Sequence, residues 1–366
     1  MLPAPEEVVP RAIERCLETG ALYEFTSFQV AIQGERRWEE LPPEVVLAYK
    51  RELKVAVGGA LERAWPARRV EFKRPHVLLI YSVPKDLVRP QVRPVCLYGR
   101  YRKLVRGLPQ TPAPWKHPEC KGKGCEGCAG TGRLHPLSLA DLLGAPAAEA
   151  FAARGGYVLH GCGREDVDVR CLGGGRPFVL ELRDPRRREV DLVALAETMR
   201  GPRAEVAGEL RFTSEEAIQR LKDAEVDKRY LARCRADAAL DPAAVAGLSA
   251  LSGEVLEQRT PWRVARRRSD KVRRRRVRIF APGALEPDGR TFCAEVAAQS
   301  GTYIKELISG DGGRTRPSVS ELLGCAVECA ELDVLGIEAV DEALLEGRGT
   351  AAVGAEGQPE PEDAGD

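Results

Sequence analysis

The chain has 366 residues, of which 43% are hydrophobic and 30% are charged, so it is long enough to bury one large core or two ordinary ones. Its formal net charge is only +1. We expect no membrane span, because no run of about 18 apolar residues occurs, and no secretory signal, because residues 1–7 lack a basic and then an apolar segment. The eleven cysteines, three of them at metal-binding spacing, favour a reducing, cytoplasmic compartment.

The N-terminal part of the chain alternates helical and strand-like patterns. An amphipathic helix is predicted over residues 6–20 and a second helix over 41–64. Residues 76–81 form a short apolar run that is consistent with a buried strand. A further helix is predicted at about 138–154, with Ser138 as its N-cap.

Before that helix lies a segment rich in glycine and cysteine, residues 117–132. It holds two consecutive knuckles of the form [CH]-x-x-C-x-G-x-G, in which glycines let the backbone turn tightly around a pair of ligands. The candidate ligands form a Cys₃His set that suits tetrahedral zinc, and they are His117, Cys120, Cys125 and Cys128. Because only four residues separate Cys120 from Cys125, a distant ligand such as Cys16 stays open as an alternative. Four protein ligands leave no open position, so the zinc would be structural and not catalytic.

From residue 157 onward, short β-like runs alternate with helical ones. The runs are 157–160, 167–171, 178–182, 209–213, 272–280 and 293–297. Thr213 and Glu216 have the spacing of a capping box that would open one helix. Strands mixed with helices predict an α+β domain, whose boundaries we place at residues 146–345. The last fifteen residues hold five acids and no basic residue, so we expect 346–366 to be a disordered acidic tail.

Two clusters of basic residues indicate binding to a phosphate backbone. Residues 263–278 hold ten Arg or Lys against one acid, and the second cluster, at 98–106, interleaves basic residues with tyrosines, which suits single-stranded RNA or a tRNA end. The candidate RNA-binding residues are Arg100, Lys103, Arg263, Arg267, Arg274 and Arg276. An ordinary charged surface is the simpler alternative for either cluster.

Two short motifs carry the candidate chemistry. Residues 163–166 read Gly-Arg-Glu-Asp, and residues 301–305 read Gly-Thr-Tyr-Ile-Lys at a predicted strand-to-helix junction. An ionised carboxylate next to an aromatic ring and a cation can form a pocket for a nucleobase. Taken alone, each motif has a simpler explanation, such as a turn with a surface ion pair. No dinucleotide-binding or P-loop pattern occurs, which argues against methyltransferase and NTPase activities.

Together these motifs resemble the G-R-x-D catalytic loop and the later G-T-Y-I-[RK] motif of pseudouridine synthases. With the strings at 99–104, 175–178 and 259–264, the resemblance is closest to the archaeal and eukaryotic THUMP-linked tRNA pseudouridine synthases. It implies an α+β synthase domain with a mixed or antiparallel sheet. It also implies an N-terminal α/β RNA-binding domain at residues 1–145 that contains a THUMP unit and the zinc knuckle.

The resemblance implies an activity as well. Members of the family isomerise uridine to pseudouridine at positions 54 and/or 55 in the T-loop of tRNA and grip its acceptor end, without a catalytic or nucleotide cofactor. Asp166 would be the catalytic carboxylate, with Asp168 as its near competitor. Lys305 would pair with Asp166 and keep it ionised.

Further substrate contacts follow from the same resemblance. The candidate substrate-binding residues are Arg164, Tyr230, Tyr303 and Lys305. Tyr230 would pack on the target base, and Arg164 would contact phosphate or hold the place of a flipped nucleotide. The main alternative function is a noncatalytic, zinc-containing tRNA- or rRNA-binding protein. A DnaJ-like zinc chaperone is a weaker alternative, because the chain has no J-domain signature.

Overall fold

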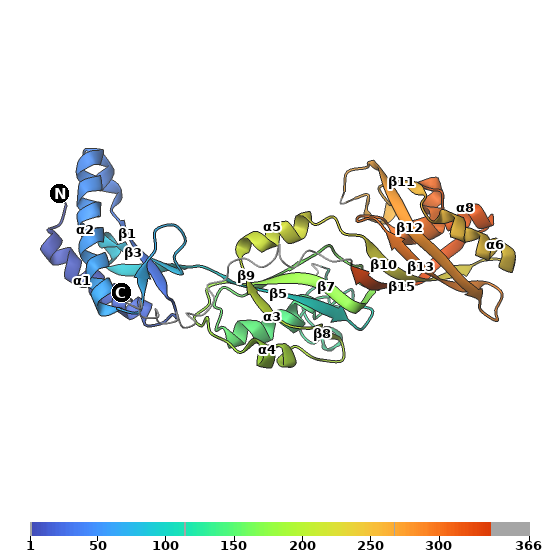
Figure 1. The fold of residues 1–366 in the computed structure, drawn as a ribbon. Coiled ribbons are helices and arrows are strands. Elements are labelled where there is room, and N and C mark those ends of the chain that lie inside the picture. Colours follow the sequence, from blue (N-terminus) through green and yellow to red (C-terminus); the bar gives the residue numbers. More distant parts are fainter. Residues whose placement is uncertain (1, 113–114, 267, 338–366) are drawn as a thin grey trace, which may run out of the picture.

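The computed structural model describes residues 2–112, 115–266 and 268–337, and Figure 1 shows them as modules that follow one another along an elongated molecule. The buried hydrophobic side chains form two separate cores. The first core draws on residues 2–92 and the second on residues 95–337. The expected boundary at 145/146 therefore falls inside the second core. Arg267 and the expected acidic tail lie outside the described residues.

The first core belongs to a small α/β module. Its elements are α1 (Pro5–Gly20), β1 (Ser27–Gln33), a 3₁₀ turn (Arg36–Glu40), α2 (Pro43–Ala64), β2 (Arg69–Val70), β3 (Val77–Ser82), a second 3₁₀ turn (Val83–Lys85) and β4 (Leu87–Val92). The strand order is β2-β1-β3-β4, with β1 parallel to β2 and β3, and β4 antiparallel to β3. The two helices and the strand predicted for this part of the chain are confirmed. No helix in the described ranges is long and apolar enough to cross a membrane.

The second core is built on an 11-stranded sheet. Nine strands follow the order β14-β11-β12-β13-β10-β15-β7-β5-β8, while β6 pairs with β7 and β9 with β5. The strands are β5 (Val95–Lys103), β6 (Tyr157–Gly161), β7 (Arg170–Leu182), β8 (Ala204–Val206), β9 (Arg211–Thr213), β10 (Lys228–Ala236), β11 (Val255–Arg259), β12 (Val272–Leu285), β13 (Thr291–Ala298), β14 (Thr315–Arg316) and β15 (Val327–Ile337). The helices are α3 (Leu139–Ala150), α4 (Leu192–Thr198), α5 (Glu215–Asp223), α6 (Pro242–Gly247), α7 (Ile304–Ser309) and α8 (Val319–Leu323). The expected α+β class with a mixed sheet is confirmed.

The last described strand, β15, lies in the middle of this sheet. It pairs antiparallel with β10 and, over Asp333–Arg170 and Val334–Cys171, parallel with β7. Figure 1 shows one half of the sheet, around β5 and β7, with α3 and α4, and the other half, around β12 and β13, with α6 and α8. The β7–β15 pairing therefore joins the two halves through residues that are 163 positions apart in the sequence, Arg170 and Asp333.

Local signals set several helix ends. Ser138 caps α3, because its side chain accepts a hydrogen bond from the Asp141 N–H (3.3 Å) while the Asp141 carboxylate accepts from Ser138 N–H (2.8 Å). The expected capping box at Thr213 and Glu216 is wrong. Thr213 ends β9, where its backbone pairs with β5, and α5 begins only at Glu215.

Candidate active site and metal-binding knuckle

The loop between β6 and β7, residues 162–169, places the first motif. It opens at Gly163, whose φ of +78° is a conformation that side chains with a Cβ rarely adopt. A Cβ there would also lie 3.0 Å from Lys228 Nζ. This glycine lets the loop turn tightly above two buried cations, Lys228 and Arg176, before the chain reaches Asp166.

Buried and half-buried side chains hold the backbone of the β6–β7 loop. The donors and their carbonyl acceptors are Lys103 Nζ to Asp166 (3.0 Å) and Val167 (3.2 Å), Gln110 Nε2 to Gly163 (3.1 Å), Arg176 Nη1 to Cys162 (2.8 Å) and Arg106 Nη1 to Asp168 (2.9 Å). The loop is thus fixed before any substrate binds. The expectation that Lys103 contacts RNA is wrong, because β5 turns it inward, where it is fully buried and burial lowers its pKa.

Glu165 anchors the buried side of this loop. Its side chain is 0% exposed and lies 2.8 Å from Arg176 Nε. The Tyr101 hydroxyl donates to both of its oxygens, at 3.0 and 2.8 Å, and burial raises the pKa of Tyr101 well above its ordinary value. The buried carboxylate is therefore both charge-paired and hydrogen-bonded, as burial of a charge requires.

Asp166 faces the open side of the loop, with a side chain that is 41% exposed. Arg263 Nη1 donates to its Oδ2 at 2.8 Å, and Lys305 Nζ lies 3.6 Å from the same oxygen. Lys305 is closer to Asp168, at 2.6 and 2.8 Å from its two oxygens. Burial opposes ionisation of Asp168, but the hydrogen bond and charge of Lys305 outweigh it and lower the pKa of Asp168. The structure thus brings Asp166, Asp168 and Lys305 together, with Arg263 as the nearest cation to Asp166.

Arg263 has a second, buried partner. Its Nε donates to Glu306 Oε1 at 2.6 Å and its Nη2 lies 3.3 Å from Oε2, while the Glu306 side chain is only 5% exposed. Burial alone would lower the pKa of Arg263, but the Glu306 hydrogen bond outweighs it and raises that pKa. Sequence reasoning assigned Arg263 to an RNA surface and missed Glu306. The available signals were the 259–264 string and the position of Glu306 directly after Lys305.

Two of the remaining substrate candidates lie near this centre. Tyr303 is held by Gln258, which accepts from the Tyr303 N–H (2.9 Å) and donates to its carbonyl (3.0 Å). The Tyr303 ring centroid lies 5.8 Å from the Arg263 guanidinium. Tyr230 is on the same face of β10 as Lys228, by strand alternation, and burial raises its pKa to about 12.

The remaining candidates differ in their exposure to solvent. Arg164 is exposed and makes no hydrogen bond or ion pair with any residue that the structure describes. Arg100 is half-buried and donates to the Gly175 carbonyl (3.0 Å). Arg274 and Arg276 are both exposed on β12, the strand expected there, so the structure leaves this basic face open to solvent.

The four candidate metal ligands come together in one cluster. One ligand atom from each of His117, Cys120, Cys125 and Cys128 lies within 4.8 Å of all the others. The Cys128 sulfur is 3.9 Å from that of Cys120 and 3.7 Å from that of Cys125, and Cys125 Sγ is 3.5 Å from His117 Nδ1. Bonds of about 2.3 Å in a tetrahedron separate sulfurs by roughly 3.8 Å, so the donor set fits zinc. Cys16 is buried in the first core, apart from this cluster.

The backbone of the knuckle supports the same interpretation. A Cβ on Gly132, whose φ is +67°, would lie 2.4 Å from the Gly122 carbonyl oxygen, so the two turns can pack this closely only with glycine at position 132. Burial opposes formation of the Cys128 thiolate, but the N–H groups of Cys125 and Gly132 donate to it and lower its pKa to about 6. A thiolate is the form that binds metals.

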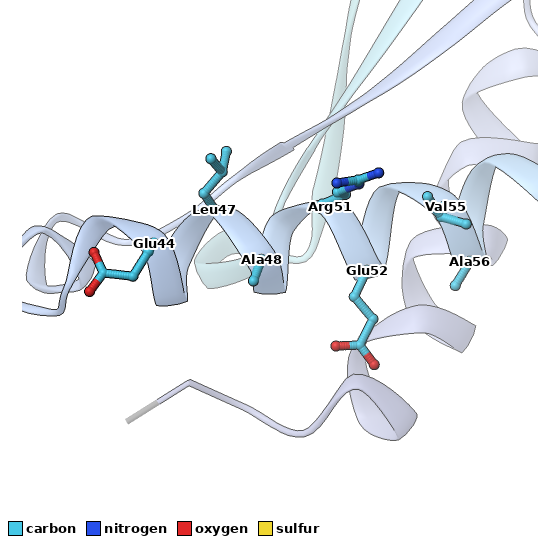
Figure 2. Close-up of a pocket in the computed structure, with 7 residues that line it drawn as sticks. All are labelled: Glu44, Leu47, Ala48, Arg51, Glu52, Val55 and Ala56. Atoms are coloured by element: carbon cyan, nitrogen blue, oxygen red, sulfur yellow. The ribbon is translucent and has the colours of Figure 1, made fainter.

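A surface depression lies elsewhere, along one helix of the first module. Its lining comes entirely from α2, and Figure 2 shows the seven side chains, Glu44, Leu47, Ala48, Arg51, Glu52, Val55 and Ala56. Leu47 and Val55 are its large exposed apolar members. This depression shares no lining residue with the surroundings of Asp166.

Known proteins match this chain over most of its length. The family described as Pus10, C-terminal, matches residues 96–338. The tRNA pseudouridine synthase Pus10 of Methanothrix thermoacetophila is 42% identical over 291 residues, which are 78% of this chain and 63% of the relative. The protein of the same name from Archaeoglobus fulgidus is 36% identical over 341 residues, covering 91% of this chain and 90% of the relative.

One more sequence relative and one solved structure are also similar to this chain. The tRNA pseudouridine synthase Pus10 of Methanopyrus kandleri is 40% identical over 315 residues, or 83% of this chain and 70% of the relative. Among solved structures, a chain of a Cbf5-Nop10-Gar1 complex aligns with a TM-score of 0.34 and 19% identity over 54% of this chain and 45% of its own. That structural match is too distant to add to the sequence relationship.

Proposed function

The chain belongs to the Pus10 family of tRNA pseudouridine synthases, and from that membership we propose that it is an isomerase that converts uridine to pseudouridine in tRNA. The observation that supports the proposal most directly is the geometry around Asp166. A carboxylate stands on a fixed loop, faces the open side and contacts two cations. This is the set of groups that the isomerisation needs.

The reaction breaks the bond between ribose C1′ and N1 of uracil, turns the base and forms a bond from C1′ to C5; C5 then loses its proton and N1 gains one. It needs an ionised carboxylate, as a nucleophile or as a base toward the ribose. Asp166 would take this role, because Arg263 and Lys305 place two positive charges beside its carboxylate and the β6–β7 loop holds its backbone in place. Asp168 would instead hold Lys305, with which it makes the shorter contact.

Aromatic and basic side chains would recognise the substrate. Tyr230 and Tyr303 would contact the target base, and Arg164, which has no partner within the described chain, is free to meet phosphate or the stack left by a flipped nucleotide. The exposed Arg274 and Arg276 would attract the backbone. We further propose that the uridines are at positions 54 and/or 55 of the T-loop, and that the first module is a THUMP-like domain for the acceptor end.

The decisive test measures pseudouridine formation on an unmodified tRNA transcript, mapped by carbodiimide primer extension. Wild-type protein should modify T-loop uridines, while Asp166→Asn should lose about 10³-fold or more in rate and keep its affinity for tRNA. The matched control is Asp223→Asn, which removes the charge of an exposed aspartate on α5. Tight tRNA binding by wild type without product would reject the isomerase and support a noncatalytic RNA-binding protein.

We also propose that the knuckle holds one structural zinc, with His117, Cys120, Cys125 and Cys128 as ligands. Such thiolates must stay reduced, so a reducing compartment such as the cytoplasm would suit the protein. Metal analysis of the purified protein should find about one zinc per chain. Cys125→Ser should lose that zinc, whereas Cys16→Ala should retain it; loss from Cys16→Ala would restore the alternative of a distant ligand.

A further inference from the structure

An exposed tryptophan stands beside the candidate active site and takes no part in the chemistry described above. Trp262 is 66% exposed, whereas its chain neighbour Arg263 donates directly to Asp166. Since consecutive Cα atoms are about 3.8 Å apart, the Trp262 backbone lies beside the residue that contacts Asp166. A large aromatic side chain left open at such a place can stack on a ligand that has an aromatic face.

The covered face of the Trp262 ring is rigidly supported. The Arg314 guanidinium carbon lies 4.2 Å from the ring centroid, and the Arg314 side chain is only 10% exposed. Arg314 is fixed in turn, because its Nε and Nη2 donate to the Thr260 carbonyl (3.1 and 2.6 Å) and Nη2 also donates to Asp270 (2.8 Å). One face of the ring is thus occupied by a fixed cation and most of the side chain remains open.

The backbone around the ring is held as well. The Trp262 N–H donates to Asp311 Oδ2 at 3.1 Å, and Trp262 begins a 3₁₀ turn that ends at Val264. The charges nearby favour a polyanion, because Arg266 and Arg268 are exposed and Arg263 lies next in the chain. RNA would find cationic partners for its phosphates on the same surface.

From this arrangement we infer that Trp262 is a stacking platform for an unpaired RNA base next to the target uridine. The inference rests on the proposed function, because it takes RNA as the substrate. Stacking on an aromatic side chain is tolerant of base identity, since every base has a π face. The platform would therefore hold the strand in position without reading its sequence, and Arg314 would fix the orientation of the ring.

The first test compares Trp262→Ala with Trp262→Phe in pseudouridine formation on the tRNA transcript. Loss of one stacking contact should raise the half-saturating RNA concentration by about 5- to 150-fold for the alanine variant. Trp262→Phe keeps a ring and should recover most of that loss. The control is Leu322→Ala, which removes an exposed apolar side chain from α8 and should leave the half-saturating RNA concentration unchanged. An unchanged half-saturation for Trp262→Ala would overturn the inference.

A second test does not depend on turnover. The chain has four tryptophans, so the difference between wild-type and Trp262→Phe fluorescence isolates the signal of Trp262. Poly(U) should quench this signal, and the duplex of poly(U) with poly(A) should not, because its bases are already stacked. Equal quenching by both, or by neither, would reject stacking. If wild type makes no pseudouridine while poly(U) still quenches Trp262, the enzyme assignment fails and the platform stands.

Discussion

The two sides of the β6–β7 loop each carry a carboxylate paired with an arginine, one buried and one open to solvent. Glu165 and Asp166 are consecutive acids, and each lies 2.8 Å from an arginine nitrogen, Arg176 for the first and Arg263 for the second. Glu165 is fully enclosed, whereas Asp166 is open to solvent. The comparison teaches that burial, and not the contact distance, separates an ion pair that fixes a backbone from one that leaves a carboxylate available for a reaction.

The largest expected effect comes from breaking the buried side. Glu165→Ala should lower the free energy of unfolding by about 3–5 kcal/mol, because it leaves the Arg176 charge buried without its partner. Urea-induced unfolding followed by circular dichroism measures this loss. Asp166→Ala is the matched variant on the open side, and it should cost less than about 1 kcal/mol. Equal losses for the two variants would contradict the distinction between the two sides.

A variant of Glu306 tests whether this buried carboxylate holds Arg263 in place against Asp166 on the open side of the loop. Glu306→Gln should reduce the rate of pseudouridine formation by about 10- to 100-fold, because Arg263 loses the charge that holds it against Asp166. Single-turnover rates at saturating tRNA measure the effect. Glu321→Gln, at an exposed acid of α8, is the control and should keep the wild-type rate. A wild-type rate for Glu306→Gln would show that Arg263 needs no anchor.

The smallest effect is expected at Asp168, which shares the open side but not the proposed chemistry. Asp168→Asn should change the rate by less than about tenfold, since Lys305 stays within reach of Asp166. The exposed pair should contribute less than about 1 kcal/mol to stability. Burial opposes ionisation, but Lys305 outweighs it and lowers the pKa of Asp168 below its ordinary value, so that contribution is present at neutral pH and is lost as the pH falls through the lowered pKa.

Unfolding of wild type and Asp168→Asn, measured at pH 7 and again near pH 3, checks this prediction. The two proteins should differ slightly at pH 7 and converge in acid. A difference that grows in acid would mean that Asp168 is stabilised in its protonated form. A rate loss as large as that of Asp166→Asn would exchange the roles assigned to the two acids.

Local features of the sequence predicted local structure well. The helices α1, α2 and α3 follow from their patterns, and Ser138 caps α3 as expected. The four knuckle ligands lie within twelve residues, so their spacing in the sequence was enough to predict that they form one site. The G-R-x-D and G-T-Y-I-K motifs predicted that Asp166 and Lys305 would meet.

Long-range pairing decided what the sequence could not predict. β5 joins the second core because it pairs with β7, which begins 67 residues after β5 ends, and no local pattern in residues 95–145 marks this. The contact between Arg263 and Asp166 spans 97 residues. Lys103 looks like one member of an exposed basic cluster, and only the position of the β6–β7 loop beneath it explains its burial.

The central position of β15 has a consequence for how the protein is made. A chain leaving the ribosome exposes both β7 and β10 before residues 327–337 are available to pair between them. Unpaired strand edges attract other strands, so nascent chains are open to aggregation until residues 327–337 have been made. Parallel pairing over such a separation is also slow. The completed sheet therefore forms only after translation has passed residue 337, and shortening the chain before β15 should yield two unjoined halves.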